Sequence, residues 1–268
     1  MEKKFLWWYE LSGQEVVEYA KECDIALLPI GAIEQHGPHC PNGSDALNAI
    51  GMAEAIAKQT GVMLLPCPWY GSHPYHHWGM PGTIPLTYET HIGLVTDIVR
   101  GAAVAGYNKF IILSAHGQVS TTIVAVHKLG LEGHFVLSLH WYDFLRDNKC
   151  VLDDCMWHAD EAETSVALYL YPQYVDMSKA VKERGEGLID AKFVIAPGMA
   201  PQPGQMYHFE GTFARPEYKE LKHGVIGDPT AASQEKGEKL VTKLVNHVSE
   251  LIEDIRKRYP SGVKPPVK

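Results

Sequence analysis

The strongest constraint on the fold is an alternation between short apolar runs and longer segments with helical periodicity. Residues 25–30, 62–66, 110–114 and 135–139 are apolar runs of the kind found in strands buried on both faces of a parallel sheet. Around them, apolar side chains recur every three or four positions in residues 11–23, 46–60, 87–106, 121–129 and 163–171. Strands that alternate with helices favour an α/β fold with a mostly parallel sheet covered by helices on both faces.

The alternation weakens after this part of the chain. Several prolines and glycines interrupt residues 176–229, which we expect to form an irregular excursion packed on the same domain. Residues 234–259 again carry an apolar face at helical spacing and predict a final amphipathic helix. Residues 260–268 contain three prolines and are expected to fray. Because 46% of the 268 residues are hydrophobic, the chain can bury a large core, and we predict one domain over residues 1–268.

Composition excludes several classes of protein. The 24 Lys and Arg residues against 32 Asp and Glu give a net charge of -8, which disfavours binding to nucleic acid. Five cysteines without a CxxC pair are typical of reduced thiols rather than of a disulfide framework. The N-terminus lacks the apolar core of a signal peptide, and no apolar run approaches the length of a membrane span. We expect a cytoplasmic protein that binds a small molecule and neither nucleic acid nor membrane.

Three polar clusters follow the predicted strands, where open α/β sheets bind their ligands. The first occupies a Gly- and Pro-rich loop after residues 25–30 and contains Glu34, His36, His39 and Asp45. Charged groups crowded into such a loop strand or repel one another unless a cation holds them. The alternative for this cluster is an exposed loop with surface histidines.

The second and third clusters are weaker signals by themselves. His116 and Gln118 follow the strand at residues 110–114, where a single histidine is often an ordinary loop residue. The third cluster opens a helix and contains His158, Glu161 and Glu163. Acidic residues are favoured in a first helical turn by the helix dipole, although Glu163 leads into an apolar helix and is expected to face the sheet.

These residues lie in segments that resemble a known family. The runs LLPIGAIEQHGPHCPNGSD, ILSAHGQ and HADEAETS are similar to the three signature motifs of the creatininase (creatinine amidohydrolase) family. Pro81-Gly82-Thr83 and the run GVIGDP at residues 224–229 fit the same pattern, so the resemblance covers about residues 5–258. It implies a three-layer α/β/α sandwich, a dinuclear metal site and a homo-oligomer, with a hexamer as the expected size.

The resemblance also implies roles for individual residues. Glu34, His36 and His116 match metal ligands, and Asp45 matches the ligand that bridges the two ions. Creatininase has a metal-binding glutamate at the position of Gln118, and Glu163 is the natural substitute for it here. His158 matches the catalytic histidine and is our candidate general acid and base, with Glu161 as the next candidate. Mixed imidazole and carboxylate ligands suit two divalent ions of Zn, Mn or Fe.

The substrate is less constrained than the metal site. The expected lining residues are Ser72, His77, Trp78, Gln118, Trp141 and Tyr142. Creatininase encloses its ligand between two tryptophans, but one of these positions falls at about Asp154 here, which argues against creatinine itself. The leading function is a creatininase-type hydrolase that cleaves a C–N bond in a small, polar, cyclic substrate. One alternative is a carbon–carbon hydrolase acting on an oxidised inositol such as 3-dehydro-scyllo-inosose, and another is a metal-binding protein without catalysis.

The N-terminal segment offers separate support for an oligomer. Five consecutive residues there are apolar or aromatic: Phe5, Leu6, Trp7, Trp8 and Tyr9. If this cluster were exposed on a monomer it would be an aggregation hazard, so we expect a second subunit to cover it.

Overall fold

The core of the protein is a parallel sheet. The computed structural model describes residues 6–74, 77–145, 151–153, 156–185 and 221–267. Within them the sheet has the order β1-β3-β2-β4-β5, and every pairing is parallel. Its strands are β1 (Leu6–Trp7), β2 (Ile25–Ile30), β3 (Met63–Leu64), β4 (Lys109–Ser114) and β5 (Phe135–His140). The predicted parallel sheet is confirmed, whereas β1, a two-residue edge strand, gave no recognisable pattern in the sequence.

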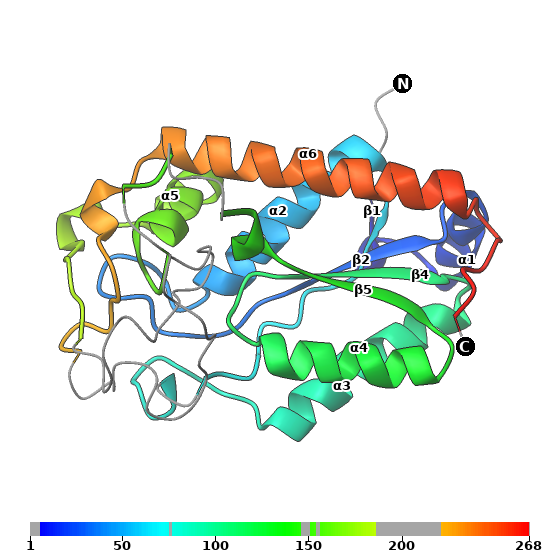
Figure 1. Ribbon diagram of the computed structural model, residues 1–268, viewed down its shortest axis with the longest axis horizontal. Helices are drawn as coiled ribbons and strands as arrows, with labels where there is room; N and C mark the ends of the chain where they lie inside the picture. The colour runs from blue at the N-terminus through cyan, green and yellow to red at the C-terminus, as the bar shows by residue number, and fades with distance from the viewer. Residues whose placement is uncertain (1–5, 75–76, 146–150, 154–155, 186–220, 268) are drawn as a thin grey trace, which may run out of the picture.

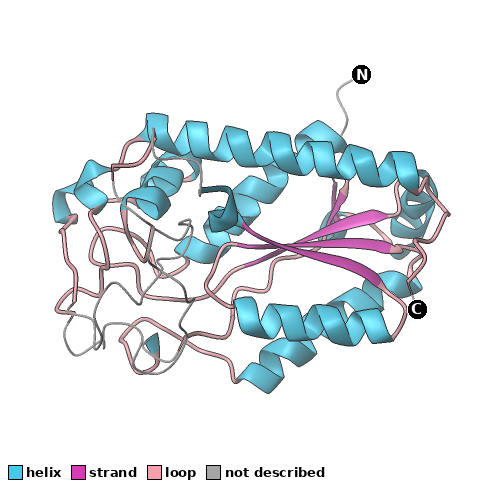
Figure 2. Cartoon of the chain, viewed as in Figure 1, coloured by secondary structure: helices cyan, strands magenta, loops and turns pink. Residues whose placement is uncertain are grey.

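Helices cover both faces of this sheet (Figures 1 and 2). One face packs against α1 (Gly13–Glu22), α3 (Tyr88–Val104) and α4 (Val119–Leu131) through a hydrophobic cluster that includes Val16, Val99 and Leu129. The other face packs against α2 (Ser44–Thr60), α5 (Glu161–Leu170) and α6 (Gln234–Arg258) through Met52, Val166, Leu244 and their neighbours. The predicted three-layer α/β/α sandwich is therefore confirmed.

Capping side chains fix where several helices begin. Ser12 Oγ accepts a hydrogen bond from the Glu15 backbone amide, and the Glu15 carboxylate accepts one from the Ser12 backbone amide, so that a capping box opens α1. Asp160 caps α5 by accepting from two backbone amides of its first turn. Helix α2 begins at Ser44, which places Asp45 in its first turn rather than in the preceding loop. This position fixes the Asp45 side chain more firmly than a loop would.

The order of the strands places a switch point at one end of the sheet. β2 and β4 are neighbours, but the helices that follow them lie on opposite faces, α2 on one and α4 on the other. Open α/β sheets bind their ligands at such a switch point, and we call the region outside the carboxyl ends of β2 and β4 the crevice. The loop after β2 carries Glu34 and His36, and the loop after β4 carries His116.

The N-terminal aromatic residues do not form the exposed cluster that we expected. Trp7 is buried in the core, and its Nε1 donates to Glu54 at 3.0 Å. Trp8 packs on Tyr107, with 5.4 Å between ring centroids, so Tyr9 is the large exposed side chain of this stretch. Phe5 lies outside the described residues. The expectation of a homo-oligomer consequently rests on the family resemblance alone.

The C-terminal segment, for which we expected a frayed end, is attached to the start of the fold. Ser261 Oγ donates to the Glu22 carbonyl at 2.7 Å, and the Gly262 amide donates to Asp24 at 2.8 Å. Pro265 is buried. Of the irregular segment 176–229, residues 186–220 lie outside the described part of the chain. No helix in the described part is long and apolar enough to cross a membrane.

A buried ion pair at the start of β4 gives a test of the fold. Lys109 Nζ lies 2.7 Å from both carboxylate oxygens of Asp24, and the lysine side chain is completely buried. Lys109→Met should lower the free energy of unfolding by about 3–5 kcal/mol, because it leaves the Asp24 charge buried without its partner. Urea denaturation followed by circular dichroism measures this change.

The surface pairs of Arg100 provide the matched control. Arg100 contacts Asp97 and Glu132 on exposed helix surfaces. Arg100→Met should change the urea midpoint much less than Lys109→Met does, because water screens exposed ion pairs. Equal losses in the two variants would show that the buried pair contributes nothing particular to stability.

Candidate metal centre

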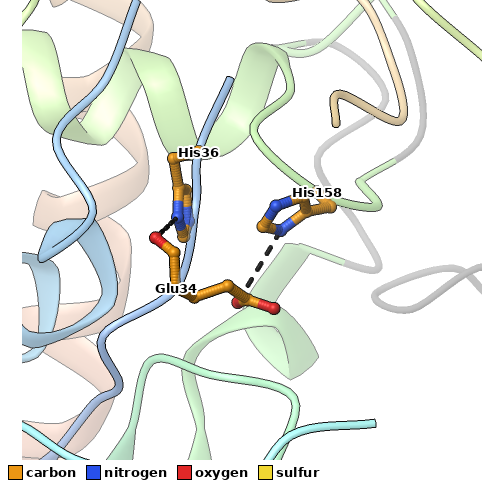
Figure 3. A group of neighbouring side chains, drawn as sticks. All are labelled: Glu34, His36 and His158. Carbon is orange, nitrogen blue, oxygen red and sulfur yellow. Dashed lines mark hydrogen bonds and ion pairs between the residues drawn. The ribbon is translucent and has the colours of Figure 1, made fainter. Parts of the chain in front are cut away.

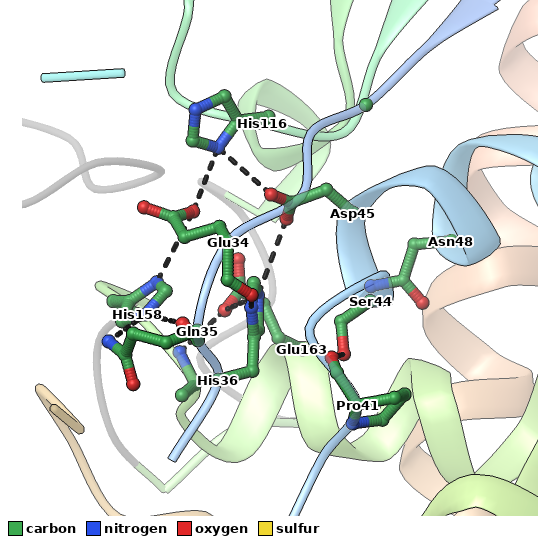
Figure 4. Close-up of polar contacts among 12 residues, drawn as sticks. Glu34, Gln35, His36, Pro41, Ser44, Asp45, Asn48, His116, His158 and Glu163 are labelled. Carbon is green, nitrogen blue, oxygen red and sulfur yellow. Dashed lines mark hydrogen bonds and ion pairs between the residues drawn. The ribbon is translucent and has the colours of Figure 1, made fainter. Parts of the chain in front are cut away.

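Five polar side chains converge in the crevice between the loops after β2 and β4 (Figure 4). They are Glu34, His36, Asp45, His116 and Glu163, and none is more than 5% exposed. They come from four separate parts of the chain, the β2 and β4 loops and the first turns of α2 and α5. These are the five residues that the sequence resemblance assigns to metal binding, and the structure brings them together.

The ring of His116 is oriented by a backbone carbonyl. Its Nε2 lies 3.0 Å from the carbonyl oxygen of Ser72. A carbonyl only accepts hydrogen bonds, so Nε2 carries a proton and Nδ1 faces the crevice. There Nδ1 lies 2.9 Å from Glu34 Oε2 and 3.0 Å from Asp45 Oδ2.

His36 repeats this arrangement on the other side of Asp45. Its Nδ1 donates to the Glu34 carbonyl at 3.0 Å, which leaves Nε2 facing the crevice. Nε2 lies 3.3 Å from Asp45 Oδ1 and 3.4 Å from Glu163 Oε2. Asp45 thus presents one carboxylate oxygen to each imidazole, which is the placement that a bridging ligand needs.

The electrostatics of the cluster call for positive charge. Burial alone would lower the pKa of His116, but Glu34 and Asp45 outweigh it and raise that pKa to about 10. Burial likewise opposes protonation of His36, but Asp45 and Glu163 raise its pKa well above the usual range. The buried oxygens Glu34 Oε1 and Asp45 Oδ2 face the imidazole nitrogens of His77 and His116.

A pair of cations would satisfy these groups. The described residues contain three sets of carboxylate and imidazole donors, and within each set the donor atoms lie within 4.8 Å of one another. One of these sets is His36, Asp45 and Glu163. Histidines that donate one ring N–H to a carbonyl and point the other nitrogen at a common centre are typical metal ligands. The residues present therefore fit two adjacent divalent ions.

The turn before α5 positions both Glu163 and His158. Ala159 adopts a left-handed backbone conformation (φ 50°), which is uncommon for a residue other than glycine. This turn lets the Ala159 amide donate to Glu163 Oε2 at 2.6 Å. On its other side, the His158 backbone pairs with Ile226 through hydrogen bonds of 2.9 and 3.3 Å. The GVIGDP run thus supports the site by holding this turn in place.

His158 lies beside Glu34 and directs its ring at the Glu34 carboxylate (Figure 3). Its Nε2 donates to the Gln35 carbonyl at 2.7 Å, so the lone pair of Nδ1 points into the site, 3.8 Å from Glu34 Oε2. Burial lowers the pKa of His158 well below the usual value. A neutral imidazole with this tautomer can accept a proton at Nδ1 and return it.

The two remaining catalytic and ligand candidates, Glu161 and Gln118, make other contacts. Glu161 pairs with Lys236 and accepts from the Asp153 amide at 2.9 Å, and it belongs to none of the donor sets found among the described residues. Gln118 donates through Nε2 to the Gly31 carbonyl at 3.2 Å, on the backbone where β2 ends. Glu163 Oε2 lies 3.4 Å from His36 Nε2, and Glu163 as the ligand that replaces the creatininase glutamate stays a prediction.

The expected substrate residues divide into two groups. Ser72, His77 and Gln118 are buried around the centre, and His77 Nδ1 contacts Glu34 Oε1. Trp78 is partly exposed near them, and its Nε1 donates to the His73 carbonyl at 3.1 Å. Trp141 is buried in the hydrophobic core beneath α6 and Tyr142 packs against that core, and the role of both in binding substrate stays a prediction. Asp154, at the other tryptophan position, lies outside the described residues.

Sequence reasoning missed three residues that shape the site. His73 belongs to a donor set with Glu34 and His116, and Gln35 orients His158 through its carbonyl. The signal for His73 was its position in the polar loop that follows β3. Gly31 matters because a side chain at this position would collide with the Ala46 backbone, and this close approach brings Asp45 into the crevice.

The comparison with known families agrees with this geometry. The family model described as creatinine amidohydrolase matches residues 9–252, which is most of the chain. The chain belongs to the creatininase family. The resemblance in the three motifs is therefore confirmed.

Individual relatives of this creatininase-family chain differ in what they hydrolyse. A 3-dehydro-scyllo-inosose hydrolase of Thermotoga maritima is 32% identical, over 96% of this chain and 85% of the relative. A creatinine amidohydrolase of Pseudomonas putida is 27% identical, over 90% of this chain and 92% of the relative. A mycofactocin precursor peptide peptidase of Mycolicibacterium smegmatis is 27% identical, over 85% and 84%. All three are hydrolases, which confirms the prediction of a hydrolytic enzyme.

Solved structures support the fold in the same way. A crystal structure of creatinine amidohydrolase superimposes with a TM-score of 0.76 at 24% identity, covering 96% of this chain and 99% of the other. A structure entitled "Creatininase Mn" gives a TM-score of 0.75, also at 24% identity, over 96% and 100%. At this identity the likeness establishes the shared α/β/α fold.

Substitution at Gly31 tests how the site is held together. Gly31→Ala should lower the free energy of unfolding by about 1–3 kcal/mol, because the new methyl group overpacks against the first turn of α2. Gly93 is the matched control, since it lies inside α3 with open space around it, and Gly93→Ala should stabilise by about 0.5–1 kcal/mol. Thermal unfolding of both variants measures the difference. A Gly31→Ala protein as stable as wild type would refute the close approach.

Proposed function

We propose that this creatininase-family hydrolase uses two divalent metal ions to attack a carbonyl group of a small, polar, cyclic substrate. One observation carries the proposal. Two buried imidazoles, each oriented by a backbone carbonyl, direct their second ring nitrogens at buried carboxylates, and both of them contact Asp45. Isolated buried charges in this arrangement would be costly without cations.

The donor atoms divide into two sets around Asp45. Glu34, Asp45 and His116 would hold one ion, and His36, Asp45 and Glu163 would hold the other. Imidazole and carboxylate donors suit Zn, Mn or Fe(II). When bound, two such ions supply a hydroxide near neutral pH and polarise a carbonyl group. The three carboxylates offset most of the charge of two dications.

His158 is the residue in position to move a proton. Its Nδ1 faces the site beside Glu34, and the hydrogen bond from Nε2 to the Gln35 carbonyl fixes this tautomer. Because burial keeps the ring neutral, Nδ1 can take a proton during attack on the carbonyl and deliver it to the leaving group. Glu161 is not available for this task in the same way, since it faces Lys236.

The leading substrate class is a cyclic amide. Attack on the carbonyl carbon breaks the C–N bond, and the nitrogen leaves with the proton from His158. The creatinine amidohydrolases among the relatives support this chemistry. Creatinine itself is disfavoured, because one of the two tryptophan positions of creatininase falls at about Asp154 here, and an aspartate cannot close over a flat ring in the same way.

A second candidate has support of its own. The imidazoles of His73, His77 and His158 surround Glu34. Imidazoles both donate and accept hydrogen bonds, which suits a ring rich in hydroxyl groups. In an inosose whose two carbonyls flank one carbon, attack at one carbonyl breaks its bond to that carbon. The second carbonyl takes up the electron pair as an enolate, and the enolate carbon then takes the proton. The Thermotoga maritima relative named 3-dehydro-scyllo-inosose hydrolase favours this reading. Arg215 and His208, which could add to such a lining, lie outside the described residues.

The first test separates metal binding from proton transfer. His158→Ala should retain two ions per chain but lose about 10²–10⁴-fold in kcat, which is the usual contribution of a general acid or base. Asp45→Ala should lose at least one ion, because Asp45 contributes to both donor sets. Plasma mass spectrometry gives the metal content and a steady-state assay gives kcat.

Two outcomes would change the assignment. If His158→Ala loses metal as severely as Asp45→Ala, His158 is a ligand, which its place in a set with Glu34 and His36 would allow. If wild type carries two ions and hydrolyses neither cyclic amides nor inososes, the metal-binding alternative without catalysis gains support. Turnover confined to one of these two classes decides between C–N and C–C cleavage.

A further inference from the structure

His73 is a buried imidazole that makes an ion-pair contact with Glu34 but no well-formed hydrogen bond within the described residues. It is 1% exposed, and neither of its ring nitrogens has a hydrogen-bond partner among the described residues. Buried polar groups are almost always hydrogen-bonded, because desolvation without a partner is costly. A ligand that is not part of the protein chain would supply the missing contact.

The ring points toward one end of the metal centre. His73 Nδ1 lies 3.4 Å from Glu34 Oε1, the carboxylate oxygen that His77 Nδ1 also contacts. The rings of His73 and His116 lie 4.5 Å apart between centroids. One donor atom each from Glu34, His73 and His116 falls within 4.8 Å of the other two, so a single cation can reach all three.

The segment that carries His73 is fixed in place. The His73 carbonyl accepts from Trp78 Nε1 at 3.1 Å and from the Tyr88 hydroxyl at 3.3 Å. The preceding residue, Ser72, supplies the carbonyl that orients His116. The same stretch of backbone therefore positions both imidazoles, and His73 need not move far to meet an ion beside His116.

We propose that His73 is a fourth protein ligand, beside Glu34, Asp45 and His116, of the ion at this end of the centre. The inference rests on the proposed dinuclear site. An imidazole donates to a cation without cancelling its charge, so this ion would keep more charge for polarising a carbonyl than a further carboxylate would leave.

The test compares two buried histidines. His73→Phe should weaken the binding of one ion by at least about 10–100-fold, the range found for groups that merely support metal ligands, and leave the other ion unchanged. The metal-free variant should unfold at a temperature no lower than wild type, because an apolar ring replaces an unpartnered polar one. His140 is the matched control: it is also buried with an unpartnered nitrogen, but belongs to no donor set among the described residues. His140→Phe should leave both affinities unchanged. Competition with a chromophoric chelator measures them.

A spectroscopic measurement on wild type does not depend on how the variant folds. In the cobalt-loaded enzyme, proton NMR should show three strongly shifted imidazole N–H signals, from His36, His73 and His116. Two signals, or wild-type affinity for both ions in His73→Phe, would overturn the inference while leaving the dinuclear site intact. A wild-type protein that binds no divalent ion would instead refute the proposed function, and this inference with it.

Discussion

The structure of the site depends on the buried carboxylate of Asp45, which lies between two imidazoles and presents one oxygen to each. Its oxygens face His36 and His116 at 3.3 and 3.0 Å, and Glu34 and Glu163 add negative charge on either side. Such a group of charges is unfavourable in a protein interior unless positive charge is supplied. The same carboxylates raise the pKa of His36 and of His116, because a protonated imidazole supplies part of this positive charge.

The strand order and two backbone features bring these charged side chains together. Because β2 and β4 are adjacent while α2 and α4 lie on opposite faces, the crevice lies at a switch point of the sheet. Gly31 lets the first turn of α2 approach the end of β2, which carries Asp45 inward. The left-handed turn at Ala159 brings His158 and Glu163 in from α5. Local backbone features thus position the side chains of the site, whereas the hydrophobic layers stabilise the sheet.

Much of this was predictable from the sequence, and the failures have physical causes. Continuous apolar runs predict β2 and β4 because strands buried on both faces need no polar side chains, and a similar run predicts β5, although this edge strand is only partly buried. The residues that converge at the candidate metal centre were predictable from their motifs. The core position of Trp141 was not, because an aromatic residue after a strand can turn either toward the crevice or into the core, and local sequence does not choose between them. His73 was missed because its role depends on proximity to Glu34, which is distant in the sequence.

The most direct test of the account is anomalous X-ray scattering from crystals of the protein loaded with Mn²⁺ or Zn²⁺, measured at the absorption edge of the metal. The account predicts two peaks in the crevice, one beside Glu34 and His116 and the other beside His36 and Glu163, with Asp45 contacting both. A single peak, peaks outside the crevice, or an Asp45 carboxylate that contacts neither ion would contradict it.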